Sequence, residues 1–238
     1  MRESGPGRHG NHGWKDTDVA VRLRGEAQPG GLLRAHYTAR MTGSEPHIIR
    51  ASALVAEPWR NGLGVTREVA RSPQDGAHWD WRVSIADVEV TAPFSAFPGI
   101  DRELVLLEGG GLRLAFDDGR TEVLDAPGMA ARFAGEAGLT GEPVDGATRD
   151  FNVMWRRDRL EALVIARPLV GSMLMVIAPG EDWLLHVASG QAQLLDEELL
   201  LERGDTALWH CEPQGRHSRI AGAGLALLVR LRERKRDA

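Results

Sequence analysis

Two segments of this sequence carry the same order of strand and turn signals, and that repetition restricts the fold. In each segment an apolar run ends at a glycine turn, a second run and a hairpin follow, and another glycine turn precedes the last run. Gly110 and Gly190 mark the first turns, 80 residues apart, while Gly128 and Gly204 mark the later ones, 76 residues apart. Because sequence repeats adopt the same local fold, we expect two copies of one β-structure.

Short apolar runs recur between Gly, Pro and Asp clusters about every ten residues from residue 47 onward, which is typical of all-β proteins. The clearest runs are 64–70, 79–88, 102–107, 112–116, 121–124, 130–133, 151–155, 160–166, 172–177, 184–188, 192–196, 198–202, 207–210 and 226–231. Asp118-Gly119 predicts a hairpin with a type I′ turn. Only 158–165 and 230–236 are compatible with a helix. The order of strands and turns is that of cupins, so the sequence predicts an all-β bicupin with two small jelly-roll barrels in one chain.

The composition divides the chain into four parts. Residues 1–46 hold eight glycines and three prolines without strand or helix periodicity. We therefore expect a flexible, disordered leader that is not necessarily part of the native protein. An N-terminal cupin-like barrel is expected at 47–150, a C-terminal one at 151–231 and a charged tail at 232–238.

Charge and cysteine content exclude several classes of function. The 29 Lys and Arg against 34 Asp and Glu leave a net charge of −5, which argues against a nucleic-acid partner. A single cysteine excludes a disulfide framework within the chain. The most apolar stretch, 169–178, is too short to span a membrane, and no signal peptide opens the sequence. We expect a cytoplasmic protein with no membrane partner.

Metal ligands do not occur in the pattern of enzymatic cupins. Those enzymes use two histidines one residue apart, a glutamate and a later histidine. The first repeat has Glu108 followed by three glycines at the equivalent turn, and the second offers only His186. His210, Cys211 and His217 form a cluster in the sequence, but adjacent ligands on one strand point to opposite faces and cannot converge on a single ion. We expect no metal and no cofactor.

Alternation along 81–87 separates an apolar face from a polar one. Trp81, Val83 and Ile85 would share one face of the strand, and Arg82 and Ser84 the other. An arginine that faces the mouth of a barrel is suited to bind a carboxylate, because guanidinium grips it with two parallel hydrogen bonds. The alternative is that Arg82 lies on the solvent face of a half-exposed strand.

Three long motifs resemble one family. They read PWRNGLGVTREVA at 58–70, WRVSIADVEVTAPFSAFPGIDR at 81–102 with LVLLEGGG following at 104–111, and RDFNVMWRR at 149–157. In this order they resemble the HutD/Ves family, and the match is collinear from about residue 47 to 231. Arg60 replaces the family's usual lysine, while Leu63 and Ala92 replace glycines. Leu63 would restrict the turn after Asn61.

The resemblance implies a bicupin that is associated with histidine utilisation in some bacteria. There the protein is thought to restrain pathway expression by binding an intermediate such as formylglutamate, and it is not established as a catalyst. The ligand-binding residues that the motifs and the polar row indicate are Trp59, Asn61, Arg67, Arg82, Ser84, Phe97, Arg102, Arg149 and Asn152. The residues expected to orient arginines are Glu68, Asp87 and Asp101.

These observations leave three hypotheses. The first is a metal-free regulator, with no catalytic residue, that binds a small anionic metabolite such as formylglutamate or urocanate. The second is an uncharacterised cupin enzyme acting on a histidine-pathway intermediate, with Glu68, Asp87 or Glu108 as the base. The third is a protein-interaction scaffold, and because exposed edge strands can pair between chains, a homodimer is expected.

Overall fold

The structure is a computed structural model that describes residues 45–59, 61–75, 78–210 and 213–235. The described residues form sixteen β-strands and one short 3-10 turn, η1 (Ala51–Ala53), without an α-helix. The all-β prediction is therefore confirmed. The expected leader lies almost entirely outside the described residues, as does Cys211. Among the described residues no helix is long and apolar enough to cross a membrane.

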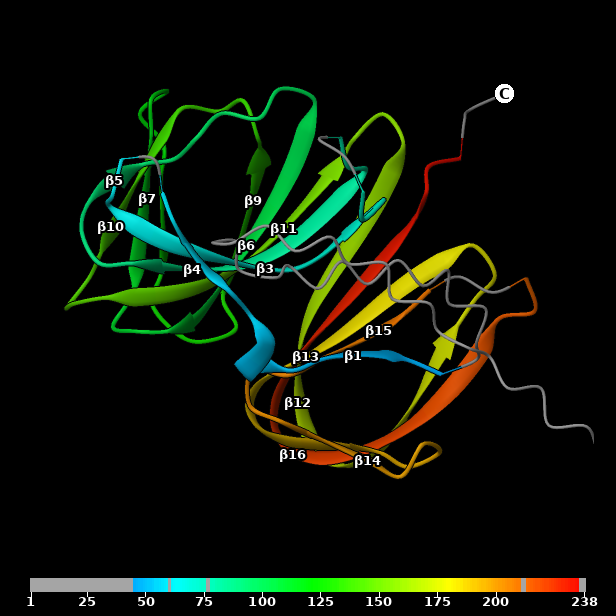
Figure 1. The fold of residues 1–238 in the computed structure, drawn as a ribbon. Helices are drawn as coiled ribbons and strands as arrows, with labels where there is room; N and C mark the ends of the chain where they lie inside the picture. The colour runs from blue at the N-terminus through cyan, green and yellow to red at the C-terminus, as the bar shows by residue number, and fades with distance from the viewer. Residues whose placement is uncertain (1–44, 60, 76–77, 211–212, 236–238) are drawn as a thin grey trace, which may run out of the picture. The chain divides into compact units, whose positions relative to one another are not determined.

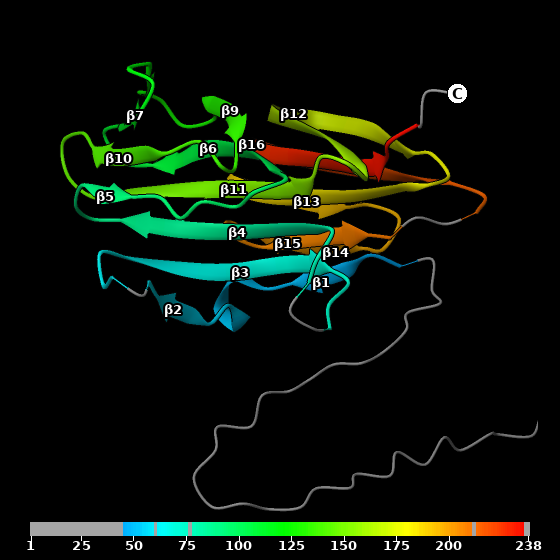
Figure 2. The same ribbon diagram turned by 90° about the horizontal axis from the view of Figure 1, so that it is seen from above.

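Two sheets form the first half of the described chain (Figure 1). The six-stranded sheet has the order β2 (Ala56–Pro58), β3 (Gly64–Ser72), β4 (Trp81–Val88), β11 (Thr148–Arg156), β6 (Ile100–Glu108) and β9 (Ala130–Ala134). The four-stranded sheet has the order β5 (Ala92–Pro93), β10 (Leu139–Pro143), β7 (Leu112–Phe116) and β8 (Thr121–Leu124). Figure 2 shows β3, β4, β11 and β6 lying side by side. Their pairings are antiparallel throughout.

One further sheet forms the second half. Its order is β1 (His47–Ile49), β15 (Thr206–Trp209), β13 (Glu181–Leu194), β16 (Arg216–Glu233) and β12 (Leu160–Ile177), with β14 (Leu199–Glu202) paired to β13. The repeat is visible in the pairing. β6 pairs with β9 and β7 with β8 in the first half, as β13 pairs with β15 and β14 in the second. Gly128 and Gly204 share a positive φ of 90°.

The pairing places two segments differently from the expected division at 150/151. That point falls inside β11, which pairs along its length with β4 and β6 of the first half. In the opposite direction, β1 pairs with β15 of the second half. The strands of the first half therefore end with Arg156. The first described strand, β1, belongs to the sheet of the second half.

In both segments compatible with helix, most of the described residues are strand instead. Leu160 begins β12, and β16 continues to Glu233, because the two strands pair over their full lengths and cover a shared core. The Asp118-Gly119 hairpin is present between β7 and β8, but the prediction of a type I′ turn was wrong. Gly119 has a φ of 89° and Asp118 is not among the residues with positive φ, whereas a type I′ turn needs both.

The six-stranded sheet has two different faces. Trp81, Val83, Phe151 and other apolar residues of one face pack against Leu184, Val229 and their neighbours on the second-half sheet, forming a core between them. The opposite face contributes to a separate core with the four-stranded sheet. A cavity with polar and apolar lining residues adjoins that second core on this face.

Candidate functional site

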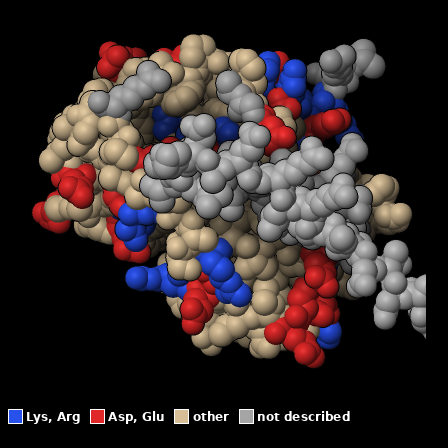
Figure 3. Space-filling model, in the orientation of Figure 1, with Lys and Arg blue, Asp and Glu red and all other residues tan. Residues whose placement is uncertain are grey.

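A cavity of about 800 Å³ lies against the six-stranded sheet on the side of the four-stranded one. Figure 3 shows basic side chains at the bottom of a hollow in the upper part of the molecule. Strands β2, β3, β4, β5, β6 and β11 and their adjoining loops supply the lining. The predicted ligand-binding residues that line it are Trp59, Asn61, Arg82, Ser84, Phe97, Arg102 and Asn152.

Strand register aligns the polar residues of the cavity floor. On β4 and β11, Arg82 stands opposite Met154, and Ser84 opposite Asn152. On β6, Arg102 stands on the other side of Met154. Since alternate residues of a strand share a face, this register gathers side chains from three strands that are distant in sequence. It also shows that the alternation places Arg82 at the cavity rather than on an open solvent face.

Arg102 is the buried cation of the cavity. Its side chain is 5% exposed, and the guanidinium carbon lies 5.2 Å from the ring centre of Phe94, 5.7 Å from that of Phe97 and 5.1 Å from that of Phe133. Nη1 donates a long hydrogen bond of 3.4 Å to the Ser95 carbonyl. Burial lowers the pKa of Arg102 to about 10, so the group remains positively charged at neutral pH. The aromatic rings hold this cation without neutralising it.

Arg82 is the second cation and is held from one side. Its Nε donates to Glu68 Oε2 at 2.8 Å, and Glu68 also contacts Arg71 at 3.4 Å. Glu68 is therefore in contact with Arg82, which is also part of the cavity lining.

The floor also contains an acid that sequence reasoning missed. Asp150 lines the cavity with 1% exposure, and neither carboxylate oxygen has a hydrogen-bond partner among the described residues. Burial, reinforced by Asp87 and opposed by Arg102, raises the pKa of Asp150 to about 7. Asp150 has the same strand parity as Asn152, so the alternation applied to β4 could have found it on β11.

Trp59 forms one wall of the cavity. Its Nε1 donates to Thr66 Oγ1 at 2.7 Å, and its ring meets Phe94 edge-on at 6.1 Å. The turn that carries it is closed by Asn61, whose side-chain oxygen accepts from the Leu63 amide at 3.1 Å. Gly62 supplies the positive φ of 70° in this turn, and Leu63 is not among the residues with positive φ. Leu63 therefore fits the turn without strain.

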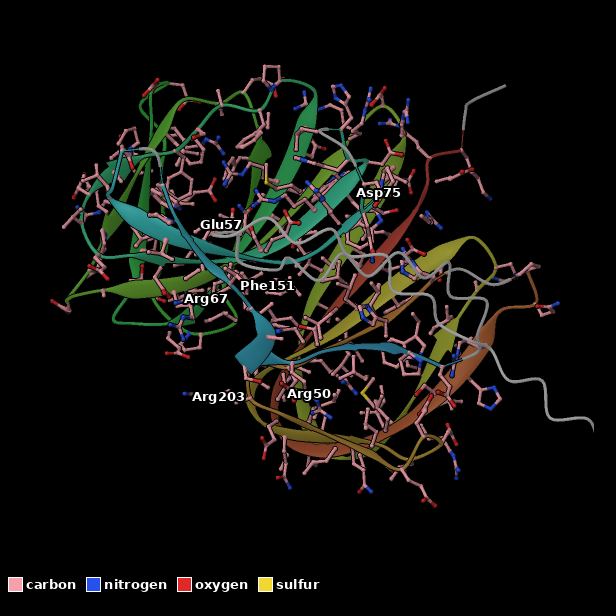
Figure 4. All side chains as sticks on the ribbon, in the orientation of Figure 1. Arg50, Glu57, Arg67, Asp75, Phe151 and Arg203 are labelled. Atoms are coloured by element: carbon pink, nitrogen blue, oxygen red, sulfur yellow. The ribbon has the colours of Figure 1, made fainter. Side chains whose placement is uncertain are left out.

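Arg67 and Arg149 do not line the cavity. Both bind Asp87, through Arg67 Nη1 at 2.5 Å and Arg149 Nε at 2.6 Å. Burial opposes ionisation of Asp87, but the hydrogen bonds from the two arginines outweigh it and lower its pKa. Figure 4 labels Arg67 apart from Glu57, a residue that lines the cavity. Arg67 and Arg149 are paired with a carboxylate of the protein itself, contrary to their expected place in the ligand site.

Asp101 and Glu108 also lie outside the cavity lining. Asp101 contacts Arg157 at 2.9 Å and Arg132 at 3.5 Å, so it orients arginines that do not line the cavity. Glu108 lies 3.6 Å from Arg149 and 3.7 Å from Arg203. Of the three bases named for an enzyme, Glu68, Asp87 and Glu108, none lines the cavity.

The donor set of enzymatic cupins has no counterpart in the described part of the chain. No three His, Cys, Asp or Glu residues there lie together in a way that could hold a metal ion. His186 is fully buried, stacks on Phe151 at 4.8 Å and contacts Thr206 Oγ1 through Nδ1 at 2.9 Å. His210 instead lies beside Asp182, which raises its pKa. These residues do not fit the metal site of a cupin enzyme.

The cavity motifs lie within the part of the chain that a known family shares. The model of the HutD family matches residues 51–228. The chain belongs to the HutD family. One similar protein is Protein Ves of Citrobacter koseri. It is 34% identical over 161 residues, which cover 67% of this chain and 79% of that protein.

Another HutD relative is an uncharacterised 21.2 kDa protein in the hutC 3′ region of Pseudomonas putida. It is 37% identical over 120 residues, which cover 50% of this chain and 63% of that protein. Among solved structures, HutD from Pseudomonas fluorescens SBW25 matches with a TM-score of 0.71 and 25% identity, over 80% of this chain and 100% of that one. The fold is thus the cupin-like all-β fold of HutD.

Proposed function

We propose that the protein binds a small carboxylate metabolite of the formylglutamate type in the cavity and thereby modulates histidine utilisation in the cytoplasm, without catalysing a reaction. Family membership and the hutC-region relative support the pathway. We further propose that the repeated strand pairing forms two jelly-roll barrels, a bicupin, with the ligand site in the first.

The observation that carries this proposal is Arg102, a cation with 5% exposure whose guanidinium lines the cavity. A buried cation is costly unless an anion accompanies it, and the nearby carboxyl group of Asp150, whose own pKa is raised to about 7, offsets this cost only in part. Arg82 lines the same cavity, so two guanidinium groups converge on a space suited to a carboxylate, which arginine binds with paired hydrogen bonds.

The size of the cavity agrees with a metabolite. About 800 Å³ lies within the range of roughly 300–1,000 Å³ that small-molecule sites occupy. The lining mixes the aromatic walls of Trp59 and Phe97 with a few polar groups such as Ser84 and Asn152. Such a lining buries a carbon chain while its charged ends are held at fixed points.

Thermal and calorimetric titration of the full chain tests the proposal. N-formyl-L-glutamate at about 100 times its Kd should raise the free energy of unfolding by about 2.7 kcal/mol. Arg82→Met should weaken binding at least about tenfold, because a buried carboxylate loses a charged partner. Arg113→Met removes an exposed arginine that pairs with Glu142 outside the cavity and should leave binding unchanged. The absence of any response to N-formyl-L-glutamate or urocanate would refute the proposal.

A second candidate is an enzyme that acts on an intermediate of the same pathway. Asp150, rather than the bases expected from sequence, favours it, since a carboxyl group with a pKa near 7 suits a general base. Turnover of N-formyl-L-glutamate or urocanate by the wild type, abolished in Asp150→Asn, would support this candidate. Binding without turnover would favour the regulator.

A further inference from the structure

The innermost part of the cavity brings together three buried polar side chains. Asp150 and Asn152 are alternate residues of β11 and face the cavity with 1% and 8% exposure. Arg102 reaches the same space from β6 with 5% exposure. Leu104 and Leu106 of β6 stand opposite Asn152 and Asp150 and are fully buried, so these two positions offer no polar partner. On β4, Ser84 stands opposite Asn152 and Ala86 opposite Asp150.

Among the fully buried atoms here that lack a hydrogen-bond partner, acceptors outnumber donors. Within the described residues, both oxygens of Asp150 and Oδ1 of Asn152 accept no hydrogen bond. Among the fully buried atoms of these three side chains, Nε of Arg102 is the one donor without a partner in the described residues. Buried polar atoms in native proteins nearly always have partners, and leaving one unpaired costs about as much as a lost hydrogen bond. The three acceptors therefore call for donors from a bound molecule.

Asp150 differs in charge from the two arginines that line the same cavity. Arg82 and Arg102 favour an anion, whereas a second carboxylate placed against Asp150 would meet a like charge or a proton shared between two acids. An N–H group placed there would instead find three acceptor atoms. The raised pKa of Asp150 is consistent with an acid that lacks a donor.

We propose that Asp150 and Asn152 form an acceptor subsite that selects ligands carrying an N–H donor in addition to a carboxylate, and that discriminates against plain dicarboxylates. The inference rests on the proposed function, because it assigns the orientation of the ligand in that same cavity. The carboxylate contacts Arg82 and Arg102, and the N–H points to Asp150. Asp150 is thus a specificity-determining residue and Arg102 an anion-binding one.

Three matched compounds test the subsite by calorimetric titration of the full chain. They are N-formyl-L-glutamate, its ester analogue in which an oxygen replaces the N–H, and glutarate, which lacks the formamido group. At pH 8, where Asp150 with its pKa of about 7 is mostly ionised, the wild type should bind the N–H compound at least about tenfold more tightly than either of the others, as expected for a hydrogen bond to a charged acceptor.

Asp150→Asn should change the order of affinities rather than lower all of them. It removes the negative charge, so binding of N-formyl-L-glutamate should weaken while binding of glutarate strengthens. Asp125→Asn makes the same change at an exposed position outside the cavity and should alter neither affinity. Thermal melting of each variant verifies that it is folded.

The outcomes separate this inference from the proposed function. If the wild type binds the three compounds equally, or if Asp150→Asn weakens all three alike, the acceptor subsite is refuted while carboxylate binding stands. If the wild type binds none of the three, the proposed function fails and the subsite with it.

Discussion

At the scale of single residues, the cavity is marked by side chains that the folded protein stabilises poorly. Asp150 is buried without a hydrogen bond from any described residue, and Arg102 is buried with only a long one from Nη1. Such groups lower the stability of a fold that could have used apolar residues instead. Their presence together in one cavity is better explained by ligand binding than by packing.

The burial of Asp150 predicts a stability that depends on pH. Its pKa rises from 3.8 in the unfolded chain to about 7 in the folded one, so the folded state loses stability as the pH rises through this range. Asp150→Asn does not titrate there. Relative to the wild type, the variant should gain up to about 4 kcal/mol between pH 4 and pH 8 in urea unfolding without ligand. A difference that stays constant with pH would contradict this.

From the burial of His186 we predict a free energy of unfolding that depends on pH in the opposite direction. Burial lowers its pKa from 6.5 to about 4, so protonation favours the unfolded chain and the free energy of unfolding falls as the pH drops from 6.5 to 4. The loss should amount to about 3 kcal/mol. His186→Gln should remove this slope, while His217→Gln, at an exposed position, should retain it. An unchanged slope in His186→Gln, measured by urea unfolding, would show that another group is responsible.

Sequence reasoning found single residues where a local rule applied. Alternation along β4 separated Trp81 and Val83, which lie in the core, from Arg82 and Ser84, which line the cavity. It did not predict the partners of charged residues. Asp87 binds Arg149 across 62 positions of sequence, and strand register, which no local pattern specifies, decides that contact.

At the scale of elements, the cavity depends on how closely β5 and β10 approach. Gly141 on β10 pairs with Ala92, and a Cβ at Gly141 would lie 2.6 Å from Cε1 of Phe94. Phe94 in turn lines the cavity beside Arg102. The glycine therefore leaves room for the ring that packs on the buried cation.

Gly141→Ala should displace the Phe94 ring toward the cavity. Because the ring moves more easily than the backbone, we expect a destabilisation of only about 1–2 kcal/mol. The affinity for N-formyl-L-glutamate should fall several-fold, since the ring takes part of the ligand's space. Calorimetric titration with parallel melting measures both effects. An unchanged affinity would show that the Phe94 wall is not part of the ligand site.

The exposed edge of strand β12 leads us to predict self-association. It is an edge strand, and the segment 168–179 carries no charged residue to discourage pairing with another strand. Val170 and Val176 are 90% and 64% exposed on it. An antiparallel edge can pair with its own copy about a two-fold axis, so we propose a homodimer through β12.

Light scattering tests this pairing. The wild type should be a dimer and Val170→Lys a monomer with an unchanged melting temperature, since a charge on an edge strand opposes pairing. A wild type that stays monomeric, or a variant that dimerises equally well, would rule out the β12 interface.

At the scale of the whole molecule, the composition and the repeat were sufficient to predict an all-β fold but not its division. The strand order within each half follows from runs and turns that are local in sequence. The placement of β1 in the second-half sheet and of β11 in the first depends on pairing partners that are distant in sequence. The core between the two large sheets adds Leu184 and Val229 to residues of β4 and β11, which local patterns could not indicate.

The net charge of the whole molecule also differs from the charge around the cavity arginines. A net charge of −5 would disfavour an anionic ligand if it were spread evenly. Arg82 and Arg102 nevertheless both line the cavity, together with Glu57 and Asp150, and the local field beside the arginines can oppose that of the whole protein. The negative charge of the chain and a carboxylate ligand are therefore compatible.

A crystal structure of the full chain with bound N-formyl-L-glutamate would test these conclusions most directly. We predict a ligand carboxylate within hydrogen-bonding distance of the Arg102 and Arg82 guanidinium groups, with the amide N–H directed to Asp150. Ligand density outside this cavity, or a carboxylate that contacts neither arginine, would contradict the assignment of the site.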